Sequence, residues 1–179
     1  MGAVPGVVRA IEHVGITVPD IEEASAFLEK AFGAEVIYDM KPDPGASQVD
    51  SALDSQSTLG IRPGALWKAS RMLRLGEGPS IELFEYSDEQ QARAAIASDI
   101  GIQHFAVYVD DMAAARQRVI DAGGRALAGP SLLPGLESGE GNMWLYTLAP
   151  WGSLIELVSF PSPQPYENGT PLRRWRPET

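Results

Sequence analysis

The sequence contains no cysteine among its 179 residues, which excludes thiolate metal ligands, disulfides and cysteine nucleophiles. Positive charge is also in short supply: 14 Lys and Arg face 24 Asp and Glu, for a net charge of −10. Nucleic-acid binding needs a basic surface, so we expect no such partner. No apolar run approaches the length of a membrane span, and the first residues lack a secretory signal pattern. We therefore expect a cytoplasmic protein with no membrane partner.

Histidine is scarce too, and its placement is informative. The two histidines occupy matching positions of a sequence that occurs twice, IEHVGITVPD around His13 and IQHFAVYVDD around His104, which are 91 positions apart. Each half also closes on the tripeptide Ile-Glu-Leu, which contains Glu82 in the first half and Glu156 in the second. One histidine and one glutamate per half, at related places, are what a divalent metal site shared between duplicated modules would need.

The hydrophobic pattern predicts the same element order, β-α-β-β-β, in both halves. Each half begins with a segment rich in β-branched and aromatic residues, continues with apolar residues at helical spacing, and ends in a hairpin. The predicted strands are 11–18, 34–40, 69–75 and 80–86 in the first half, and 102–109, 125–128, 142–148 and 153–160 in the second. A helix is expected after the first strand of each half, and glycine ends both.

These patterns divide the chain into modules and connections. We expect a first module at 9–86, a helical linker at 87–100, a second module at 101–160 and an extended C-terminal tail at 161–179. His13 and Glu82 are 17 positions further apart than His104 and Glu156. The extra residues fall within an insertion at about 41–68, predicted to be a loop with a short helix, and long loops of this kind are often functional.

Strand alternation places every candidate ligand on the face opposite an apolar set. Glu82 and Glu156 each stand between Ile and Leu in mid-strand, where a carboxylate is unusual unless it is paired or bound to a metal. The alternative is that both strands face solvent on that side, where Glu and His carry no penalty. Mixed nitrogen and oxygen ligands suit Zn²⁺, Ni²⁺, Co²⁺, Mn²⁺ or Fe²⁺ without ranking them.

Over about residues 9–160 the chain resembles the vicinal oxygen chelate superfamily, which includes glyoxalase I, methylmalonyl-CoA epimerase, bleomycin- and fosfomycin-resistance proteins and extradiol dioxygenases. The resemblance implies an α+β fold in which two βαβββ modules form an open, curved, eight-stranded mixed sheet around a metal-binding cavity. It also implies one divalent metal ion held by His13, Glu82, His104 and Glu156, and a homodimer in which one chain or two build the cavity.

The ligand set favours one activity within that family. A ligand set whose fourth member is glutamate resembles those of glyoxalase I-like lyases and of epimerases. The dioxygenases resemble a three-ligand scheme of two histidines and one glutamate. The resemblance therefore implies a metal-dependent lyase or isomerase that acts on a small-molecule, oxygenated substrate. It would transfer a proton through a metal-stabilised enediolate, with Glu82 and Glu156 as catalytic bases. Two alternatives stay open: an extradiol-type dioxygenase, and a non-catalytic, drug-binding protein of the bleomycin-resistance kind.

Three further residues are candidates for substrate contact. Tyr108 and Phe84 share the strand face of the predicted ligands, and Arg71 would suit an acidic group. A cluster of three arginines within 173–176 could serve the same purpose, although ordinary solvated charge is the simpler interpretation of these side chains.

Overall fold

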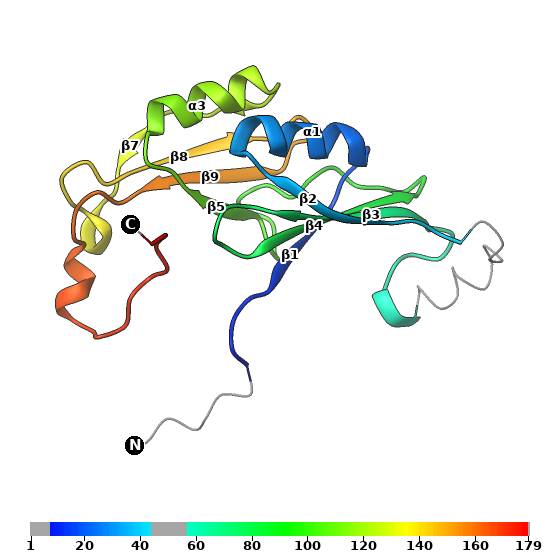
Figure 1. Ribbon diagram of the computed structural model, residues 1–179, viewed down its shortest axis with the longest axis horizontal. Helices are drawn as coiled ribbons and strands as arrows, with labels where there is room; N and C mark the ends of the chain where they lie inside the picture. Colours follow the sequence, from blue (N-terminus) through cyan, green and yellow to red (C-terminus); the bar gives the residue numbers. More distant parts are fainter. Residues whose placement is uncertain (1–7, 44–56, 179) are drawn as a thin grey trace. The chain divides into compact units, whose positions relative to one another are not determined.

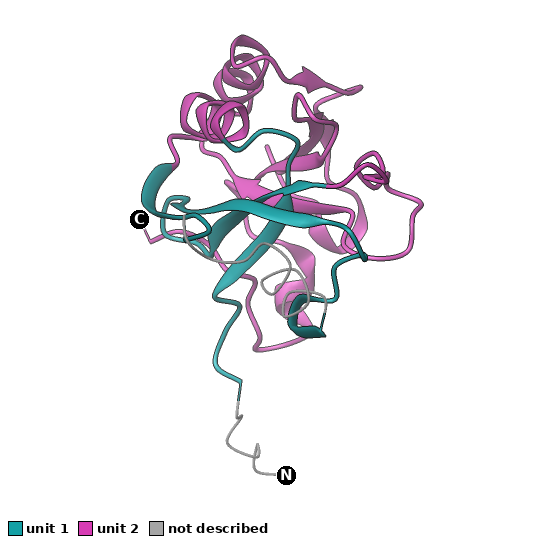
Figure 2. Cartoon of the chain, turned by 90° about the vertical axis from the view of Figure 1, so that its right-hand side faces the viewer, with its two compact units in different colours: residues 1–21, 35–87 teal, residues 22–34, 88–179 magenta. Residues whose placement is uncertain are grey.

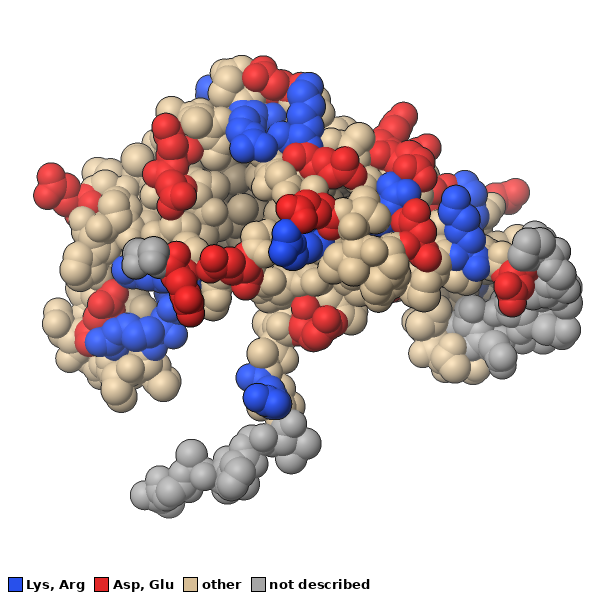
Figure 3. Space-filling view, in the orientation of Figure 1, with Lys and Arg blue, Asp and Glu red and all other residues tan. Residues whose placement is uncertain are grey.

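The computed structural model describes residues 8–43 and 57–178. By its internal contacts the chain forms two compact units, which are coloured separately in Figure 2. The first unit comprises residues 1–21 and 35–87, and the second comprises 22–34 and 88–179. Among the described residues, no helix is long and apolar enough to cross a membrane. On the face shown in Figure 3, acidic and basic side chains are interspersed, without a continuous basic stripe.

The first unit is built on a four-stranded mixed sheet in the order β1-β4-β3-β2 (Figure 1). Its strands are β1 (His13–Thr17), β2 (Glu35–Met40), β3 (Leu66–Arg74) and β4 (Ser80–Ser87). β1 runs parallel to β4, while β3 is antiparallel to both of its neighbours. The first strand of the module is therefore paired with the last, although 62 residues separate them in the sequence.

The second unit repeats this arrangement with the order β5-β9-β8-β6, and β7 adds a short pairing to β8. Its strands are β5 (His104–Tyr108), β6 (Arg125–Ala126), β7 (Ser131–Leu132), β8 (Met143–Leu148) and β9 (Leu154–Ser159). β5 is parallel to β9, and β8 is antiparallel to β9, as in the first unit. Two 3₁₀ helices complete it, η1 (Gly135–Glu137) and η2 (Pro165–Asn168).

In the described part of the chain the two longest helices are α1 (Ile21–Phe32) and α3 (Met112–Asp121). From Glu22 onward α1 groups with the second unit. The two helices lie side by side in Figures 1 and 2. The guanidinium of Arg118 donates to the carbonyl of Lys30, at 3.2 Å from Nη2, so the end of α1 is hydrogen-bonded to α3. The ring of Phe27 packs edge-on against Trp151, with centroids 5.5 Å apart. A helix encoded in the first half of the repeat thus packs with elements of the second half.

Gly124 gives this packing a testable feature. A Cβ at Gly124 would lie 2.8 Å from both the carbonyl oxygen of Leu148 and a methyl of Val119, and 3.0 Å from the ring of Phe27. Gly124→Ala is therefore expected to destabilise the protein by about 1–3 kcal/mol, the usual cost of overpacking. Chemical denaturation monitored by circular dichroism measures it. Gly78→Ala is the matched control, because its Cβ would meet nothing closer than 3.8 Å and stability should change little. Equal stability of the two variants would contradict this packing.

The α+β class is confirmed, and every strand predicted from the sequence is present. The strands pair as two mixed sheets, one in each unit, and each buries an apolar face. Side chains at most 3% exposed include Leu73, Ile81 and Leu83 in the first unit and Val119, Leu145, Ile155 and Leu157 in the second. The single open eight-stranded sheet around a cavity, and the module boundaries implied by the repeat, stay predictions.

The connections differ from expectation in two places. The predicted helical linker at 87–100 is wrong: residues 88–103 form turns and irregular backbone. The carboxylate of Asp99 accepts the backbone N–H of Ile96, and that of Asp88 accepts the N–H of Gln90. Such local side-chain hydrogen bonds compete with the helical pattern.

The tail predicted as extended contains a turn of 3₁₀ helix, η2, because Gln164 and Glu167 cap each other's backbone and Pro165 starts the turn. Of the insertion at 41–68, residues 44–56 lie outside the described part. Residues 57–59, which follow them, are helical.

Candidate active site

The first unit brings His13 and Glu82 together. Nε2 of His13 lies 3.3 Å from Oε2 of Glu82, and the side chains are 41% and 12% exposed, respectively. β1 and β4 are in parallel register with Gly15 opposite Glu82, so the histidine and the glutamate project from adjacent strands on one face. The other ring nitrogen of His13, Nδ1, is 2.5 Å from Oε2 of Glu12. The hydrogen bond with Glu12 raises the pKa of His13, and the charge of Glu82 acts in the same direction.

The second unit brings His104 and Glu156 together in the same way. Nε2 of His104 lies 3.3 Å from Oε2 of Glu156. β5 and β9 are in the equivalent register, with Ala106 opposite Glu156 where Gly15 stands opposite Glu82. Nδ1 of His104 is buried and has no hydrogen-bond partner among the residues that the structure describes, in contrast to Nδ1 of His13. Burial raises the pKa of Glu156, while the neighbouring His104 and the charge of Arg174 act against that rise.

The two His–Glu pairs have the donor chemistry and the spacing of metal ligands. Neutral imidazole nitrogen and carboxylate oxygen both present lone pairs, so at 3.3 Å they need a proton or a cation between them. Two ligand atoms each about 2.1 Å from one ion stand roughly 3.0–3.4 Å apart at tetrahedral or octahedral angles. Each pair therefore fits half of such a site. In residues 8–43 and 57–178, no group of three or more His, Asp or Glu side chains is gathered for metal binding.

Aromatic side chains surround the second pair. The ring of Tyr146, which lies opposite Glu156 on β8, packs edge-on against His104 with centroids 5.2 Å apart. Trp144 packs on Tyr146 at the same separation. The sequence-predicted contact residue Tyr108 lies on β5 with His104, and its ring packs against Phe160 at 5.6 Å. The His104–Glu156 pair is thus one part of a face that is otherwise aromatic and apolar.

The first His–Glu pair has aromatic neighbours on β4 but none at the position of β3 that lies opposite Glu82. Phe84, a sequence-predicted contact residue, stacks on Tyr86 with centroids 6.1 Å apart, and both follow Glu82 on the same side of β4. Gly15 leaves room for Phe84, since a Cβ there would be 3.4 Å from its ring. Met72 stands opposite Glu82, where the second unit has Tyr146 opposite Glu156. Both units therefore carry a histidine next to a glutamate, and they differ in the side chains that lie beside this pair.

Arg71 is not brought together with the first His–Glu pair. It lies opposite Leu83 in the sheet register, so it projects to the other face of the sheet from Glu82. Its side chain is 10% exposed and holds Asp39 through two hydrogen bonds, of 2.6 and 3.1 Å. Arg71 lowers the pKa of Asp39. The residue that suited an acidic substrate in the sequence is engaged in an ion pair within its own sheet.

Two features of this face could not be assigned to it from the sequence. Tyr146 and Trp144 lie on β8 at alternate positions, so the strand parity that selected Tyr108 also indicates them once β8 is paired with β9. Arg174 lies 18 residues after Glu156 in the tail, and no periodicity connects the two. Only the folded path of the tail brings the Arg174 charge into electrostatic range of that glutamate.

Two βαβββ repeats, each presenting a histidine and a glutamate on one sheet face in the same register, define the class of this protein as a duplicated-module, α+β protein with a candidate metal site. The chain matches the family described as Glyoxalase/Bleomycin resistance protein/Dioxygenase superfamily over residues 12–133, and it belongs to that family. The matched segment contains His13, Glu82 and His104, while Glu156 lies beyond it.

Relatives and solved structures agree with this assignment. The chain is 34% identical over 177 residues to a 2-epi-5-epi-valiolone epimerase from an Actinomyces species, covering 98% of this chain and 92% of that protein. It is 31% identical over 118 residues to an ethylmalonyl-CoA/methylmalonyl-CoA epimerase from Cereibacter sphaeroides, covering 65% and 73%, respectively. A glyoxalase family protein from Bacillus cereus has the same fold, with a TM-score of 0.66 at 16% identity over 87% of this chain and 96% of that one. The epimerase relatives support an isomerase-like role.

Proposed function

We propose that this protein is a metal-dependent epimerase that moves a proton at a carbon next to a carbonyl group. The observation that carries the proposal is the repeated His–Glu pair, with the same register and the same 3.3 Å separation in both units. The proposed ligands are His13, Glu82, His104 and Glu156, and they would hold one divalent ion. A dimer, with the ion held by one chain or by two, is part of the same proposal.

The donor types and the 3.3 Å spacing within each pair support the proposal of such an ion. A bound divalent cation would supply Lewis acidity toward the oxygens of a hydroxyketone or related substrate. Zn²⁺, Ni²⁺, Co²⁺, Mn²⁺ and Fe²⁺ all accept this mixture of imidazole and carboxylate. The aromatic residues around the second pair would line the substrate and limit the access of water to it.

The glutamates supply the proton chemistry in this proposal. Epimerisation requires that one group takes the proton from the carbon and that a proton returns to the opposite face. Glu82 and Glu156 come from different modules, which supplies two carboxylates for these two roles.

The similarity to the valiolone epimerase, which extends over 98% of this chain, supports a hydroxylated ketone as the substrate. 2-Epi-5-epi-valiolone is a polyhydroxylated cyclic ketone, whose carbonyl and neighbouring hydroxyl are the oxygens this chemistry needs. We propose this substrate class over coenzyme A esters, because the second relative matches 65% of the chain and the composition is acidic.

Deuterium incorporation tests the reaction directly. The metal-loaded protein is incubated in D₂O with 2-epi-5-epi-valiolone. Proton NMR then follows the signal of the hydrogen bonded to the carbon next to the carbonyl. We expect that signal to disappear and a second epimer to accumulate, and methylmalonyl-CoA to exchange more slowly. Oxygen consumption with a catechol and no exchange on either substrate would favour a dioxygenase instead. Tight binding of bleomycin without either reaction would favour a sequestering protein.

A further inference from the structure

In the tail after β9, Arg174 packs on the ring of Phe160. The guanidinium carbon of Arg174 lies 4.7 Å from the centre of the Phe160 ring, within the range of a cation–π contact. Nη1 of Arg174 forms an ion pair with Glu137, and its backbone N–H donates to the hydroxyl of Tyr166 at 3.0 Å. These three contacts fix the position of the side chain, which is still 40% exposed.

The surface under Arg174 is the one that carries the second His–Glu pair. Phe160 directly follows β9 and forms one hydrophobic cluster with Val158, which lies two positions after Glu156 and so on the same side of the sheet. Tyr108, which packs against Phe160, follows His104 by four positions on β5 and shares its side in the same way.

We propose that Arg174 contacts the substrate and determines specificity, donating hydrogen bonds to hydroxyl oxygens on the side of Glu156. This inference rests on the proposed epimerase function and deepens it. A guanidinium carries five N–H donors in a planar fork and accepts none, so it suits neighbouring oxygens of a polyhydroxylated ring. Glu137 engages Nη1 alone, and the exposed part of the group leaves other donors for a ligand.

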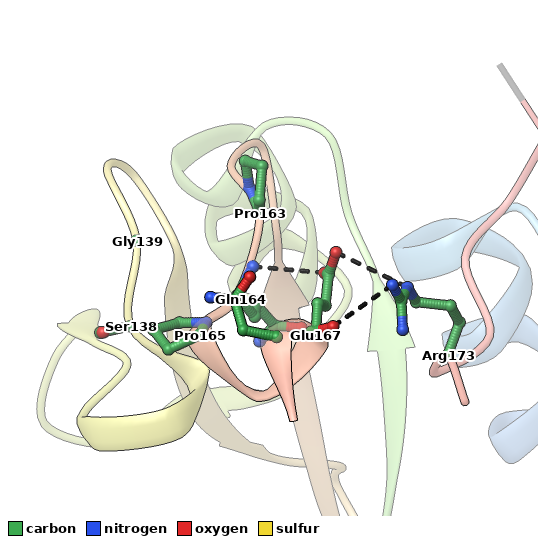
Figure 4. A pocket seen from close by; sticks show the side chains of 8 residues that line it. Ser138, Gly139, Pro163, Gln164, Pro165, Glu167 and Arg173 are labelled. Atoms are coloured by element: carbon green, nitrogen blue, oxygen red, sulfur yellow. Dashed lines mark hydrogen bonds and ion pairs between the residues drawn. The ribbon is translucent and has the colours of Figure 1, made fainter. Parts of the chain in front are cut away.

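A purely structural role for Arg174 would be to anchor the tail through Glu137. Two variants separate the alternatives, because Arg174→Met removes the guanidinium while Glu137→Gln breaks the same ion pair and leaves the guanidinium in place. Arg173→Met is a second control on the same segment. Arg173 donates to the carbonyl of Thr170 at 2.7 Å, and its Nε lies 3.7 Å from Oε2 of Glu167. Figure 4 shows Arg173 and Glu167 among the residues that line one pocket.

The measurement is kcat/KM for 2-epi-5-epi-valiolone and for 2-hydroxycyclohexanone, which keeps the carbonyl and one hydroxyl but lacks the others. Arg174→Met is expected to lower kcat/KM for the first substrate by about 10- to 100-fold, as loss of a hydrogen bond to a charged group does. It should change the second by less than about threefold, so that the preference between the substrates shrinks. Glu137→Gln and Arg173→Met should keep the wild-type preference.

Equal losses on both substrates, or the same loss in Glu137→Gln as in Arg174→Met, would show that Arg174 only anchors the tail and would overturn the inference. Calorimetric titration of each variant with 2-epi-5-epi-valiolone gives a readout that is independent of turnover. If the wild-type protein binds this ketone without converting it, the proposed reaction fails, while weaker binding in Arg174→Met alone still supports the contact. Absence of binding to the wild-type protein would overturn both.

Discussion

Replacing Glu156 by glutamine is expected to lower turnover by about a hundred- to ten-thousand-fold, the usual contribution of a general base. The amide has nearly the same size and keeps an oxygen that can ligate a metal, but it accepts no proton at neutral pH. Metal content should therefore fall much less than turnover. Steady-state epimerisation rates and elemental analysis of the same preparations provide the two measurements. Glu82→Gln is expected to behave similarly if the two glutamates divide the proton transfers.

The control is Glu35→Gln, which removes a carboxylate of β2 that is 65% exposed and paired with Arg74. Its turnover should stay close to that of the wild-type protein. A parallel loss of metal and activity in Glu156→Gln would assign this residue to ligation alone. Full activity in both Glu82→Gln and Glu156→Gln would remove the proposed bases and, with them, the proposed mechanism.

Loss of a histidine ligand is the second large effect that we expect. His104→Ala removes one of the two nitrogen donors of the proposed site, and turnover should fall to background together with the affinity for divalent metal. Chelation of the wild-type protein should abolish turnover as well, and adding back one of Zn²⁺, Ni²⁺, Co²⁺, Mn²⁺ or Fe²⁺ should restore it. Calorimetric titration of the metal-free protein with each ion measures affinity and stoichiometry, expected to be one ion per site.

Glu12→Gln provides the graded comparison for this experiment. Glu12 contacts Nδ1 of His13, whereas Nε2 faces Glu82. Glu12 would therefore hydrogen-bond to a metal-binding histidine without binding the metal itself. Loss of such a partner costs about 10- to 100-fold in metal affinity or activity. The loss of metal affinity and of activity in His104→Ala should be larger than the loss in Glu12→Gln. Unchanged metal affinity in His104→Ala, with a folded protein by circular dichroism, would refute the four-ligand site.

The sequence alone determined the repeat, the order of the helices and strands along the chain, and the strand face on which each candidate ligand lies. His13 and His104 are the only histidines, and Glu82 and Glu156 stand in identical tripeptides, so the duplication was visible without any structure. Strand alternation then assigned each candidate ligand to the face opposite the apolar core, because successive side chains of a strand point to opposite sides. The register observed in both sheets agrees with that assignment.

Local hydrogen bonding was harder to predict than periodicity. The linker at 87–100 has apolar residues at spacings compatible with a helix, yet Asp88 and Asp99 bind nearby backbone N–H groups and hold turns. The tail was expected to be extended, but the reciprocal capping of Gln164 and Glu167 closes a turn of 3₁₀ helix. Such choices depend on single side chains, whose effect a pattern of apolar residues does not contain.

Only the tertiary structure decided which residues share a face when they are distant in the sequence. It turned Arg71 away from Glu82 and into an ion pair with Asp39, because its place opposite Leu83 fixes its side of the sheet. It grouped α1 with the second unit through the packing of Phe27. It also brought Arg174 onto Phe160, on the side of the sheet that carries Glu156. Contacts of this kind arise from strand register and the path of the backbone, which no local stretch of sequence specifies by itself.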